Sequence, residues 1–255
     1  MSSITAVIIT YNEARNIQKC LVSLKTVADE IIVVDSFSTD DTVAICQQEG
    51  AKVIQNAWPG FGPQKNFGIQ HAKHEYILSL DADEALDNEL IASIQTAKKQ
   101  GLQNTYEFTR LNYYYGKFLR HGFEYPDYKI RLFPKSKVRW NDELVHETLQ
   151  ISPNVTLQRL KGHLLHYTYY AIREHVAKAN KYTDLGAELN FKKGKKASWF
   201  KIIFSPLITF IQAYVFKKGF LDGGHGFILA VFHAYGAFMK YTKLWMLNNE
   251  KPNEQ

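Results

Sequence analysis

The stretch Tyr76-Ile77-Leu78-Ser79-Leu80-Asp81-Ala82-Asp83-Glu84 decides the fold of this chain. It begins as a short apolar run and ends in three acids within four positions. A short apolar run bounded by polar residues predicts a buried strand of an α/β sheet. Ligands of such sheets bind beyond the carboxyl ends of the strands, so we expect Asp81 and Asp83 at the mouth of a crevice.

The spacing of the two aspartates indicates a metal site. Alternate residues of an extended segment point the same way, so both carboxylates should face the crevice. Such hard oxygen ligands suit Mg²⁺ or Mn²⁺, which can bridge to phosphate oxygens. The alternative is that Asp83 caps a helix running from Glu84 toward Lys99.

Strands and helices alternate before this stretch. Asp40 and Gly50 have the residue types of an N-cap and a C-cap for one of the helices. The alternation predicts a parallel sheet with right-handed crossovers. The expected strands are residues 4–10, 30–34, 51–55 and 75–80, and the expected helices are residues 14–27, 41–49 and 64–71.

The first strand-to-helix turn excludes a dinucleotide-binding fold. Such a fold needs Gly-x-Gly-x-x-Gly at this point. The turn here is Thr10-Tyr11-Asn12-Glu13-Ala14-Arg15-Asn16, without a glycine, and no Walker sequence occurs. Something else must neutralise phosphate charge, and a metal at Asp83 is the candidate.

Composition predicts one large domain, or one domain with an appendage, built around a packed core. The chain has 255 residues and is 45% hydrophobic. Its net charge of +6 is uneven: residues 1–155 hold 16 Lys and Arg against 19 Asp and Glu, whereas residues 156–255 hold 15 against 6. A basic region suits nucleic acid or an anionic membrane. Because it lacks a nucleic-acid-binding motif and is rich in large apolar residues, we expect a membrane surface and no nucleic acid.

The two cysteines, Cys20 and Cys46, lie inside apolar helical patterns and lack metal-site spacing. They suit a reduced, cytoplasmic location. The beginning of the sequence has no basic region and only a short apolar stretch, so we expect no signal peptide.

Three segments resemble the family 2 glycosyltransferases of the GT-A fold, in the family's order and spacing. They are Ile8-Ile9-Thr10-Tyr11-Asn12-Glu13, then Val33-Val34-Asp35-Ser36 with Ser38-Thr39-Asp40, then Leu80-Asp81-Ala82-Asp83-Glu84. The remainder is similar to bacterial enzymes of lipopolysaccharide inner-core synthesis, the β-1,4-glucosyltransferase subgroup. That similarity is carried by Asp127-Tyr128-Lys129-Ile130-Arg131-Leu132-Phe133, Val145-His146-Glu147 and Leu221-Asp222-Gly223-Gly224-His225-Gly226-Phe227.

The resemblance implies an α/β fold with a mostly parallel sheet and helices on both faces. It implies a catalytic domain over residues 1–170, with a nucleotide-sugar half (1–100) and an acceptor half (101–170). Residues 171–255 would form a helical, membrane-associating region. The implied activity is a metal-dependent inverting transfer from a nucleotide-diphosphate sugar, a UDP-sugar above all, to a lipid-linked or lipopolysaccharide-core acceptor. The implied location is cytoplasmic, peripheral on the inner face of the bacterial cytoplasmic membrane.

The family's functional positions map onto this sequence residue by residue. Asp35 would hydrogen-bond the nucleotide base, Asp81 would contact ribose or metal, and Asp83 would bind Mg²⁺ or Mn²⁺. The other residues expected to bind the nucleotide sugar are Thr10, Tyr11, Asn12, Glu13, Lys65 and Ala82. Lys65 matches a basic residue that precedes Asn in the family; the alternative is a solvated helix lysine.

An inverting transfer needs one general base for the acceptor hydroxyl. The candidates are Asp127, Asp142, Glu143 and Glu147, and His146-Glu147 matches the subgroup motif, so Glu147 is predicted. The alternative is an ion pair between Glu147 and a nearby arginine. The leaving diphosphate would be stabilised by the metal.

Two histidines stand three apart, so in an extended segment His163 and His166 face opposite ways. Some GT-A enzymes use a late histidine as a metal ligand, which makes His166 a candidate. The alternative is a packed polar residue.

Aromatic and basic residues gather in two further regions. Residues 105–120 contain six aromatic residues with two arginines, which suits an acceptor platform or ordinary strand packing. Residues 199–216 and 227–239 are apolar and flanked by lysines, which is typical of helices lying in a membrane interface. The alternative for both apolar stretches is burial against the catalytic domain or a dimer contact.

Two other functions share parts of this pattern. A nucleotidyltransferase has the same strand–helix alternation but needs a glycine-rich loop with a basic residue after the first strand, which is missing. A non-catalytic sugar-nucleotide-binding module at the membrane is the third possibility: a degenerate module that only binds membrane or partner proteins. Intact Asp35, Asp81 and Asp83 count against it. Nucleotide-sugar turnover with and without EDTA separates the three functions.

Overall fold

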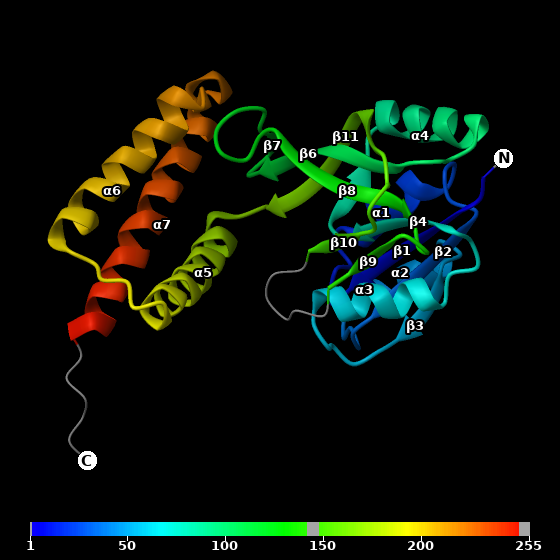
Figure 1. Cartoon of the computed structure of the whole chain (residues 1–255), viewed down its shortest axis with the longest axis horizontal. Coiled ribbons are helices and arrows are strands. Elements are labelled where there is room, and N and C mark those ends of the chain that lie inside the picture. Colours follow the sequence, from blue (N-terminus) through cyan, green and yellow to red (C-terminus); the bar gives the residue numbers. More distant parts are fainter. Residues whose placement is uncertain (1, 142–147, 250–255) are drawn as a thin grey trace, which may run out of the picture. The chain divides into compact units, whose positions relative to one another are not determined.

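The structure is a computed structural model, and it describes residues 2–141 and 148–249. The chain divides into two compact units (Figure 1). The first unit contains Met1–Leu111 and Asp127–Tyr167, and the second contains Asn112–Pro126 and Thr168–Gln255. The excursion 112–126 therefore belongs with the C-terminal helices.

The first unit opens with a parallel sheet, as the strand–helix alternation predicts. Its strands lie in the order β3, β2, β1, β4, and all three pairings are parallel. The right-handed crossover rule places the intervening helices against this sheet. The strands are β1 (Ile4–Thr10), β2 (Glu30–Asp35), β3 (Lys52–Gln55) and β4 (Tyr76–Asp81), and the helices are α1 (Ile17–Leu24), α2 (Thr42–Gln48) and α3 (Phe61–Gln70).

Beyond β4 the sheet continues with antiparallel pairings, which the sequence did not predict. Strand β8 (Asp127–Pro134) pairs with β4 and with β6 (Thr105–Tyr114). The long β11 (Leu157–Tyr169) pairs with the short β5 (Glu84–Leu86). The smaller strands are β7 (Lys117–Phe118), which pairs with β6, and β9 (Val138–Trp140) and β10 (Leu149–Ile151), which pair with each other.

Helices cover both faces of the parallel sheet because alternate residues of its buried strands point to opposite sides. In β1, Ile4, Ala6 and Ile8 pack with α1, α2 and α4 (Asn88–Gln100). Val7 and Ile9 pack on the other side, with α3 and β9. Both faces are thus apolar, and the predicted α/β fold class is confirmed.

The acidic stretch does not open a helix, which removes the alternative reading of Asp83 as a helix cap. Glu84 begins β5, and α4 starts only at Asn88. The N-cap of α4 is Asp87, whose carboxylate accepts a hydrogen bond from the backbone N–H of Leu90 at 2.7 Å. Gly162 lies so close to this cap that a Cβ there would come within 2.1 Å of the Leu90 nitrogen.

The second unit is a layer of helices packed on the β6–β7 hairpin. Helix α7 (Gly224–Asn249) lies between α5 (Ile172–Lys192) and α6 (Trp199–Ile211) (Figure 1). A π-helical turn, η1 (Gln212–Phe216), extends α6, and a short 3₁₀ turn, η2 (Gly219–Asp222), leads into α7. The core of this unit joins Tyr114, Leu119, Tyr169 and Leu229.

Residues 199–216 are helical, as the apolar pattern predicts, and almost all of them lie at the surface. Among the described residues, this helix is long and apolar enough to cross a membrane by length and composition. Only Ile202 and Ala213 are buried along it. Within its own unit this stretch is therefore mostly exposed.

Candidate active site

A cavity lies at the carboxyl ends of β1 and β4, where the sequence places the crevice. The parallel register pairs Ile9 with Asp81, so the turn after β1 meets the acidic end of β4. The cavity has a volume of about 120 Å³. Its lining residues are Ile9, Thr10, Tyr11, Glu13, Trp58, Asp81, Ala82 and Asp83.

The turn after β1 is fixed by the loop after β2. Asn12 has a φ of +53°, which an asparagine tolerates better than most residues. Its N–H donates to the Ser38 hydroxyl at 2.8 Å, and its side-chain oxygen accepts from the Thr39 N–H at 2.8 Å. The Glu13 N–H donates to the Thr42 hydroxyl at 2.8 Å. Two neighbouring strand ends thus form one rigid wall.

Asp35 is fully buried at the end of β2. Its carboxylate accepts hydrogen bonds from the Ser38 N–H, at 3.0 Å, and from the Ser38 hydroxyl. Asp35 therefore sets the path of the loop that holds Asn12. The predicted helix cap Asp40 also bonds nearby, accepting from the N–H groups of Thr42 and Ala14 at 3.1 and 3.2 Å.

Asp83 and His166 come together from distant parts of the chain. His166 lies on β11, paired with Glu84 of β5, and its Nε2 is 3.3 Å from an Asp83 oxygen. His163 points to the other side and contacts Asp87 at 3.1 Å, as the spacing predicts for an extended segment. Burial raises the pKa of the Glu13 carboxyl, and the Asp83 carboxylate raises it further.

The chemistry of this pair fits a divalent cation in part. Carboxylate oxygens suit Mg²⁺ and Mn²⁺, and Mg²⁺ is commonly held by one or two carboxylates plus substrate phosphates, whereas an imidazole is not a preferred ligand of these hard cations. Within residues 2–141 and 148–249, no three His, Cys, Asp or Glu side chains gather closely enough to hold a metal by themselves.

Asp81 is held by two cations rather than left open. One of its oxygens lies 3.0 Å from Lys65 Nζ, and the other accepts a bond from Arg131 at 3.0 Å. Burial opposes ionisation of Asp81, but Lys65 and Arg131 outweigh it and hold the pKa of this carboxyl well below its usual range. Lys65 is fully buried, with Nζ also 4.3 Å from the centre of the Trp140 ring, so it is not a solvated lysine.

Helix α3 positions Lys65 through its next residue. The Asn66 side chain donates to the Trp140 carbonyl at 2.9 Å and accepts from the Trp140 N–H at 3.2 Å, as a neighbouring strand would. At Gly62, a Cβ would come within 2.1 Å of the Asn141 carbonyl. Helix α3 therefore packs directly against the backbone at the end of β9, which sets the position of the Lys65 backbone.

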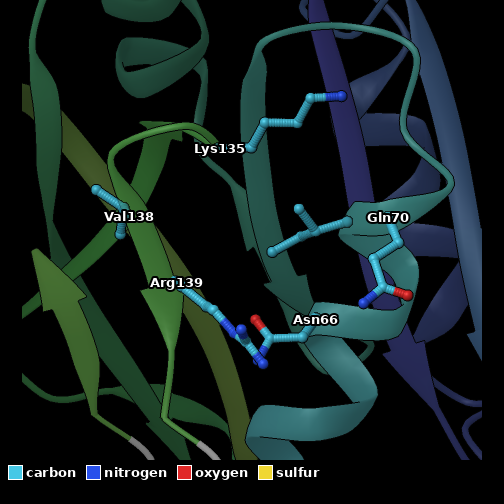
Figure 2. Close-up of a pocket in the computed structure, with 6 residues that line it drawn as sticks. Asn66, Gln70, Lys135, Val138 and Arg139 are labelled. Carbon is cyan, nitrogen blue, oxygen red and sulfur yellow. The ribbon is translucent and has the colours of Figure 1, made fainter.

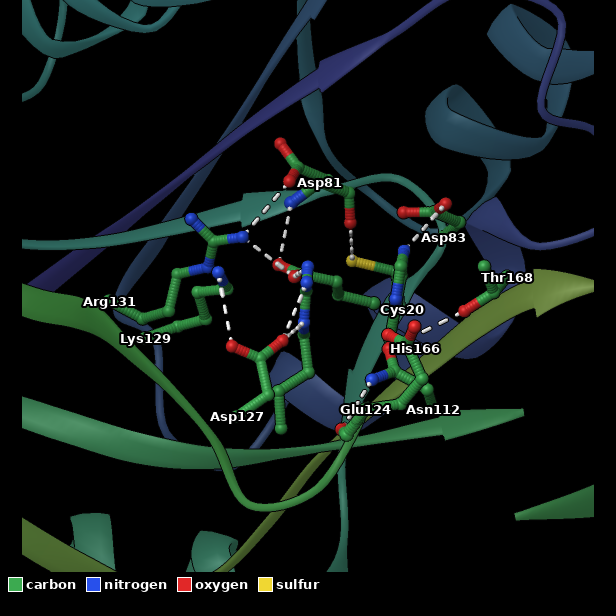
Figure 3. Close-up of polar contacts among 12 residues, drawn as sticks. Cys20, Asp81, Asp83, Asn112, Glu124, Asp127, Lys129, Arg131, His166 and Thr168 are labelled. Carbon is green, nitrogen blue, oxygen red and sulfur yellow. Dashed lines mark hydrogen bonds and ion pairs between the residues drawn. The ribbon is translucent and has the colours of Figure 1, made fainter. Parts of the chain in front are cut away.

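The ion-pair network extends to Glu84, Arg110 and Arg131, which the sequence did not assign to the site, and to the candidate base Asp127 (Figure 3). Arg131 also donates to buried Glu84 at 2.7 Å, and the other Glu84 oxygen accepts from the Asp81 N–H at 3.1 Å. Arg110 lies 3.4 Å from Glu84 and 2.7 Å from Asp127. The sequence offered one signal for this network, the third acid of the stretch, Glu84. Its partners Arg110 on β6 and Arg131 on β8 could not be found in the same way, because antiparallel strand pairing brings them to Glu84.

A second, larger cavity of about 450 Å³ opens beside the same network. It has basic, aromatic and apolar walls. Arg159 stacks on one wall residue, Tyr128, with its guanidinium carbon 3.5 Å from the ring centre. The lining residues are Asp81, Glu107, Arg110, Tyr128, Lys129, Ile130, Arg131, Trp140, Thr148, Leu149 and Ile151.

The four candidate bases fall into two groups. Asp127 forms ion pairs with Arg110 and Lys129, at 2.7 and 3.1 Å, so its carboxylate is committed to cations. Asp142, Glu143 and Glu147 lie outside the described residues.

In the aromatic stretch 105–120, Tyr106 and Phe108 are buried in the core. For these two residues the alternative of ordinary strand packing is therefore the correct one.

A third cavity, of about 380 Å³, contains none of the predicted site residues (Figure 2). It lies between α3 and the β8–β9 turn, and Asn66 and Arg139 point toward one another across it (Figure 2). Its walls are Asn66, Ile69, Gln70, Lys135, Val138 and Arg139.

The chain is thus an α/β protein with a cavity at the carboxyl edge of its parallel strands, the edge at which ligands of such sheets bind. Residues 5–160, more than half of the chain, match glycosyl transferase family 2. The chain belongs to this family and is a glycosyltransferase.

Several relatives match nearly the whole chain, among them the following two. An uncharacterized glycosyltransferase of Rickettsia typhi is 32% identical over 99% of this chain and 90% of its own length. The lipopolysaccharide core biosynthesis glycosyltransferase LpsC of Rhizobium meliloti is 31% identical over 95% of this chain and 92% of its own. Among solved structures, Staphylococcus aureus TarS in complex with UDP-GlcNAc is 13% identical, covers 99% of this chain and 93% of that one, and has a TM-score of 0.49.

Proposed function

We propose that this glycosyltransferase is metal-dependent and inverting, and that it moves a sugar from a nucleotide-diphosphate sugar to a lipid-linked or lipopolysaccharide-core acceptor. The observation that carries this proposal is the cavity where Thr10, Tyr11 and Glu13 meet Asp81 and Asp83. A full-length relative named for lipopolysaccharide core biosynthesis supports the acceptor class.

In this proposal the donor binds along the carboxyl ends of β1, β2 and β4, with UDP as the expected nucleotide. Asn12 and Asp35 shape the wall that receives the nucleoside, because their hydrogen bonds fix both loops through Ser38. Asp83 and His166 would hold Mg²⁺ or Mn²⁺. The cation would neutralise the diphosphate and stabilise it as a leaving group.

Lys65 and Arg131 orient Asp81 at the floor of the donor site. Both oxygens of this carboxylate already face cations, so Asp83 and His166 are better placed than Asp81 for a metal. We propose that Asp81 contacts the donor's ribose or a metal-bound group while its charge stays balanced by the two cations.

The acceptor is proposed to enter the larger cavity, which shares Asp81 with the donor cavity. Trp140 and Thr148 both line it, and in sequence they stand on either side of residues 142–147. We propose Glu147 as the base that takes the acceptor proton, because His146-Glu147 matches the motif of the subgroup that the sequence resembles.

Membrane attachment is proposed to bring the enzyme to its lipid acceptor. The exposed apolar helix 199–216 and the lysines before and after it support this proposal. The resulting location is cytoplasmic, on the inner face of the bacterial cytoplasmic membrane.

Nucleotide-sugar binding and turnover test the proposed function. We expect UDP-sugars to raise the melting temperature only with Mn²⁺ or Mg²⁺ present, and EDTA to abolish both this shift and donor turnover. Turnover that survives EDTA would refute the metal dependence. Release of pyrophosphate from a nucleoside triphosphate and a sugar phosphate would instead identify a nucleotidyltransferase.

A further inference from the structure

Helix α6 and its π-helical extension η1 have three chemically different sides. One side carries a continuous stripe of exposed apolar residues with helical spacing. Polar residues recur on a different side, at Lys201, Ser205 and Gln212, and the buried Ile202 and Ala213 mark the side that faces α7. The exposed apolar stripe is Trp199, Phe200, Ile203, Phe204, Leu207, Ile208, Ile211 and Val215.

Helix α7 presents a similar outer stripe. Its inner residue Leu229 enters the core with Tyr114 and Leu119 of the β6–β7 hairpin. Its lysine Lys243 bonds to α5, 2.6 Å from Asp184. The exposed apolar residues of the outer stripe are Phe227, Ile228, Val231, Tyr235 and Phe238.

The start of α6 is fastened to the end of α7. The Ala197 N–H donates to the Asn248 side chain at 3.0 Å, which in turn donates to the Lys195 carbonyl at 3.3 Å. The rings of Trp199 and Trp245 lie 5.4 Å apart. Exposed lysines gather at this end, at 192, 193, 195 and 196.

The other end of the α6–α7 pair, which we call the tip (residues 217–222), is fastened to polar backbone of the same unit. The buried Asp222 carboxylate accepts from the N–H groups of Arg120 and His121 at 3.0 and 2.8 Å. Lys117 donates to the Asp222 carbonyl at 2.9 Å, and the Gly122 N–H donates to the Lys217 carbonyl at 2.9 Å. Two exposed lysines, Lys217 and Lys218, stand at the tip.

A spanning orientation would break this unit. If α6 crossed a bilayer, the tip and the hairpin bonded to it would have to pass to the far side. Charged α5 residues would also enter the hydrocarbon, because α5 packs along α7, with Lys243 bonded to Asp184 and Asn180. Charged side chains and open sheet edges are strongly disfavoured there.

We propose that α6 and α7 lie flat in the surface of an anionic bilayer, with both lysine clusters on the same side of the membrane. The apolar stripes enter one leaflet, while the lysines at the base and at the tip reach its headgroups. This inference rests on the proposed membrane attachment and specifies its form: an in-plane helical pair rather than a membrane span.

Thiol labelling on vesicles distinguishes the two forms. The native cysteines Cys20 and Cys46 are buried, so the unmodified chain gives the background. Full-length Lys217→Cys, at the tip, and Lys193→Cys, at the base, are added to preformed vesicles of phosphatidylcholine and phosphatidylglycerol. Floated protein is then treated with a membrane-impermeant maleimide. We expect both sites to be labelled to the same extent without detergent. A tip labelled only after detergent overturns the proposal in favour of a span.

Flotation tests the apolar contact with matched variants. We expect Ile203→Gln/Leu207→Gln to weaken vesicle binding by more than about tenfold, because two half-exposed apolar side chains lose their burial. Gln212→Asn, on the polar side of the same helix, should bind like the wild type. Wild-type binding should survive high salt, since burial of apolar surface is not screened. Equal binding by all three proteins, or no binding at all, overturns the proposal.

A donor-binding measurement on the same proteins separates this inference from the proposed activity. The Ile203→Gln/Leu207→Gln variant should keep the UDP-sugar-dependent rise in melting temperature, since neither residue lines the donor cavity. Loss of vesicle binding with donor binding intact supports the in-plane surface. Normal vesicle binding in a protein that binds no nucleotide sugar would instead count against the proposed function alone.

Discussion

Replacement of Lys65 by methionine tests whether its buried charge holds the acidic end of β4. Methionine has a similar length and suits an apolar environment, so the substitution removes the charge while filling most of the space. It leaves Asp81 with Arg131 as its remaining cation, at 3.0 Å. It also removes the ammonium group over the Trp140 ring, at 4.3 Å.

The expected loss in the free energy of unfolding follows from the burial of the Lys65–Asp81 ion pair. Removal of one partner from a buried ion pair costs about 3–5 kcal/mol. Here the cost should be smaller, because Asp81 keeps Arg131 and its side chain is 27% exposed. The desolvation of Lys65 is also no longer incurred. We therefore expect Lys65→Met to lower the free energy of unfolding by about 2 kcal/mol at neutral pH.

The effect should depend on pH. The pKa of Asp81 is lowered in the folded protein, so its ionised form stabilises the fold above the unfolded pKa of about 3.9 and loses this contribution as the pH falls through the lowered value. Without Lys65 the pKa of Asp81 should rise toward its usual range. The difference in unfolding free energy between wild type and variant should therefore be largest at neutral pH and shrink only as the pH falls below about 4, toward the lowered pKa of Asp81 in the wild type.

Urea unfolding of both proteins at neutral pH and at a pH of about 2.5, below the usual pKa of an aspartate, measures this difference. Lys99→Met, in exposed helix surface, is the matched control and should change stability by less than about 0.5 kcal/mol. A Lys65→Met/Asp81→Asn double variant should recover part of the loss, because the Asp81 oxygen that faced Lys65 no longer carries charge and Arg131 keeps its ion pair with Glu84. An unfolding free energy equal to that of the wild type, or a loss that is the same at both pH values, would refute the reasoning.

Three further predictions concern donor binding and transfer. Asp83→Asn should keep the fold but lose Mn²⁺-dependent donor binding, measured by thermal shift; normal donor turnover would contradict the metal assignment. Asp35→Ala should weaken nucleotide binding by about 1.5–3 kcal/mol, the range for hydrogen bonds to a charged group, with metal dependence unchanged; titration calorimetry showing unaltered affinity would exclude its role. Glu147→Gln should bind donor normally and transfer sugar about 10²–10⁴-fold more slowly; full activity would move the base to Asp142, Glu143 or Asp127.

Local patterns in the sequence predicted the parallel half of the sheet. The apolar runs that end in Asp35 and Asp81 are strands because both of their faces are buried, and the structure gives β2 and β4 those ends. The carboxyl ends of parallel strands meet at one edge, so Asp81 and Asp83 could be placed at the crevice from the residue pattern. Thr10, Tyr11 and Glu13, which line the same cavity, were expected there only from the family resemblance.

The antiparallel half could not be predicted in the same way. Short strands such as β5 and β9 carry little periodic signal, and their partners lie far away in sequence. This pairing brings Arg131 onto Asp81 and Glu84, and His166 onto Asp83. The full burial of Lys65 likewise depends on β9, whose Trp140 covers it.

The sequence by itself determined the order of strands and helices, the acidic end of β4 and the apolar character of residues 199–216. Each of these is a local property, written in periodicity and residue type over a few turns or one strand. Only the tertiary structure decided which charges are neutralised and which side of α6 is exposed. Both depend on contacts between residues far apart in the chain, such as Lys65 with Asp81, or Asp222 with the β6–β7 hairpin, whose geometry no local pattern records.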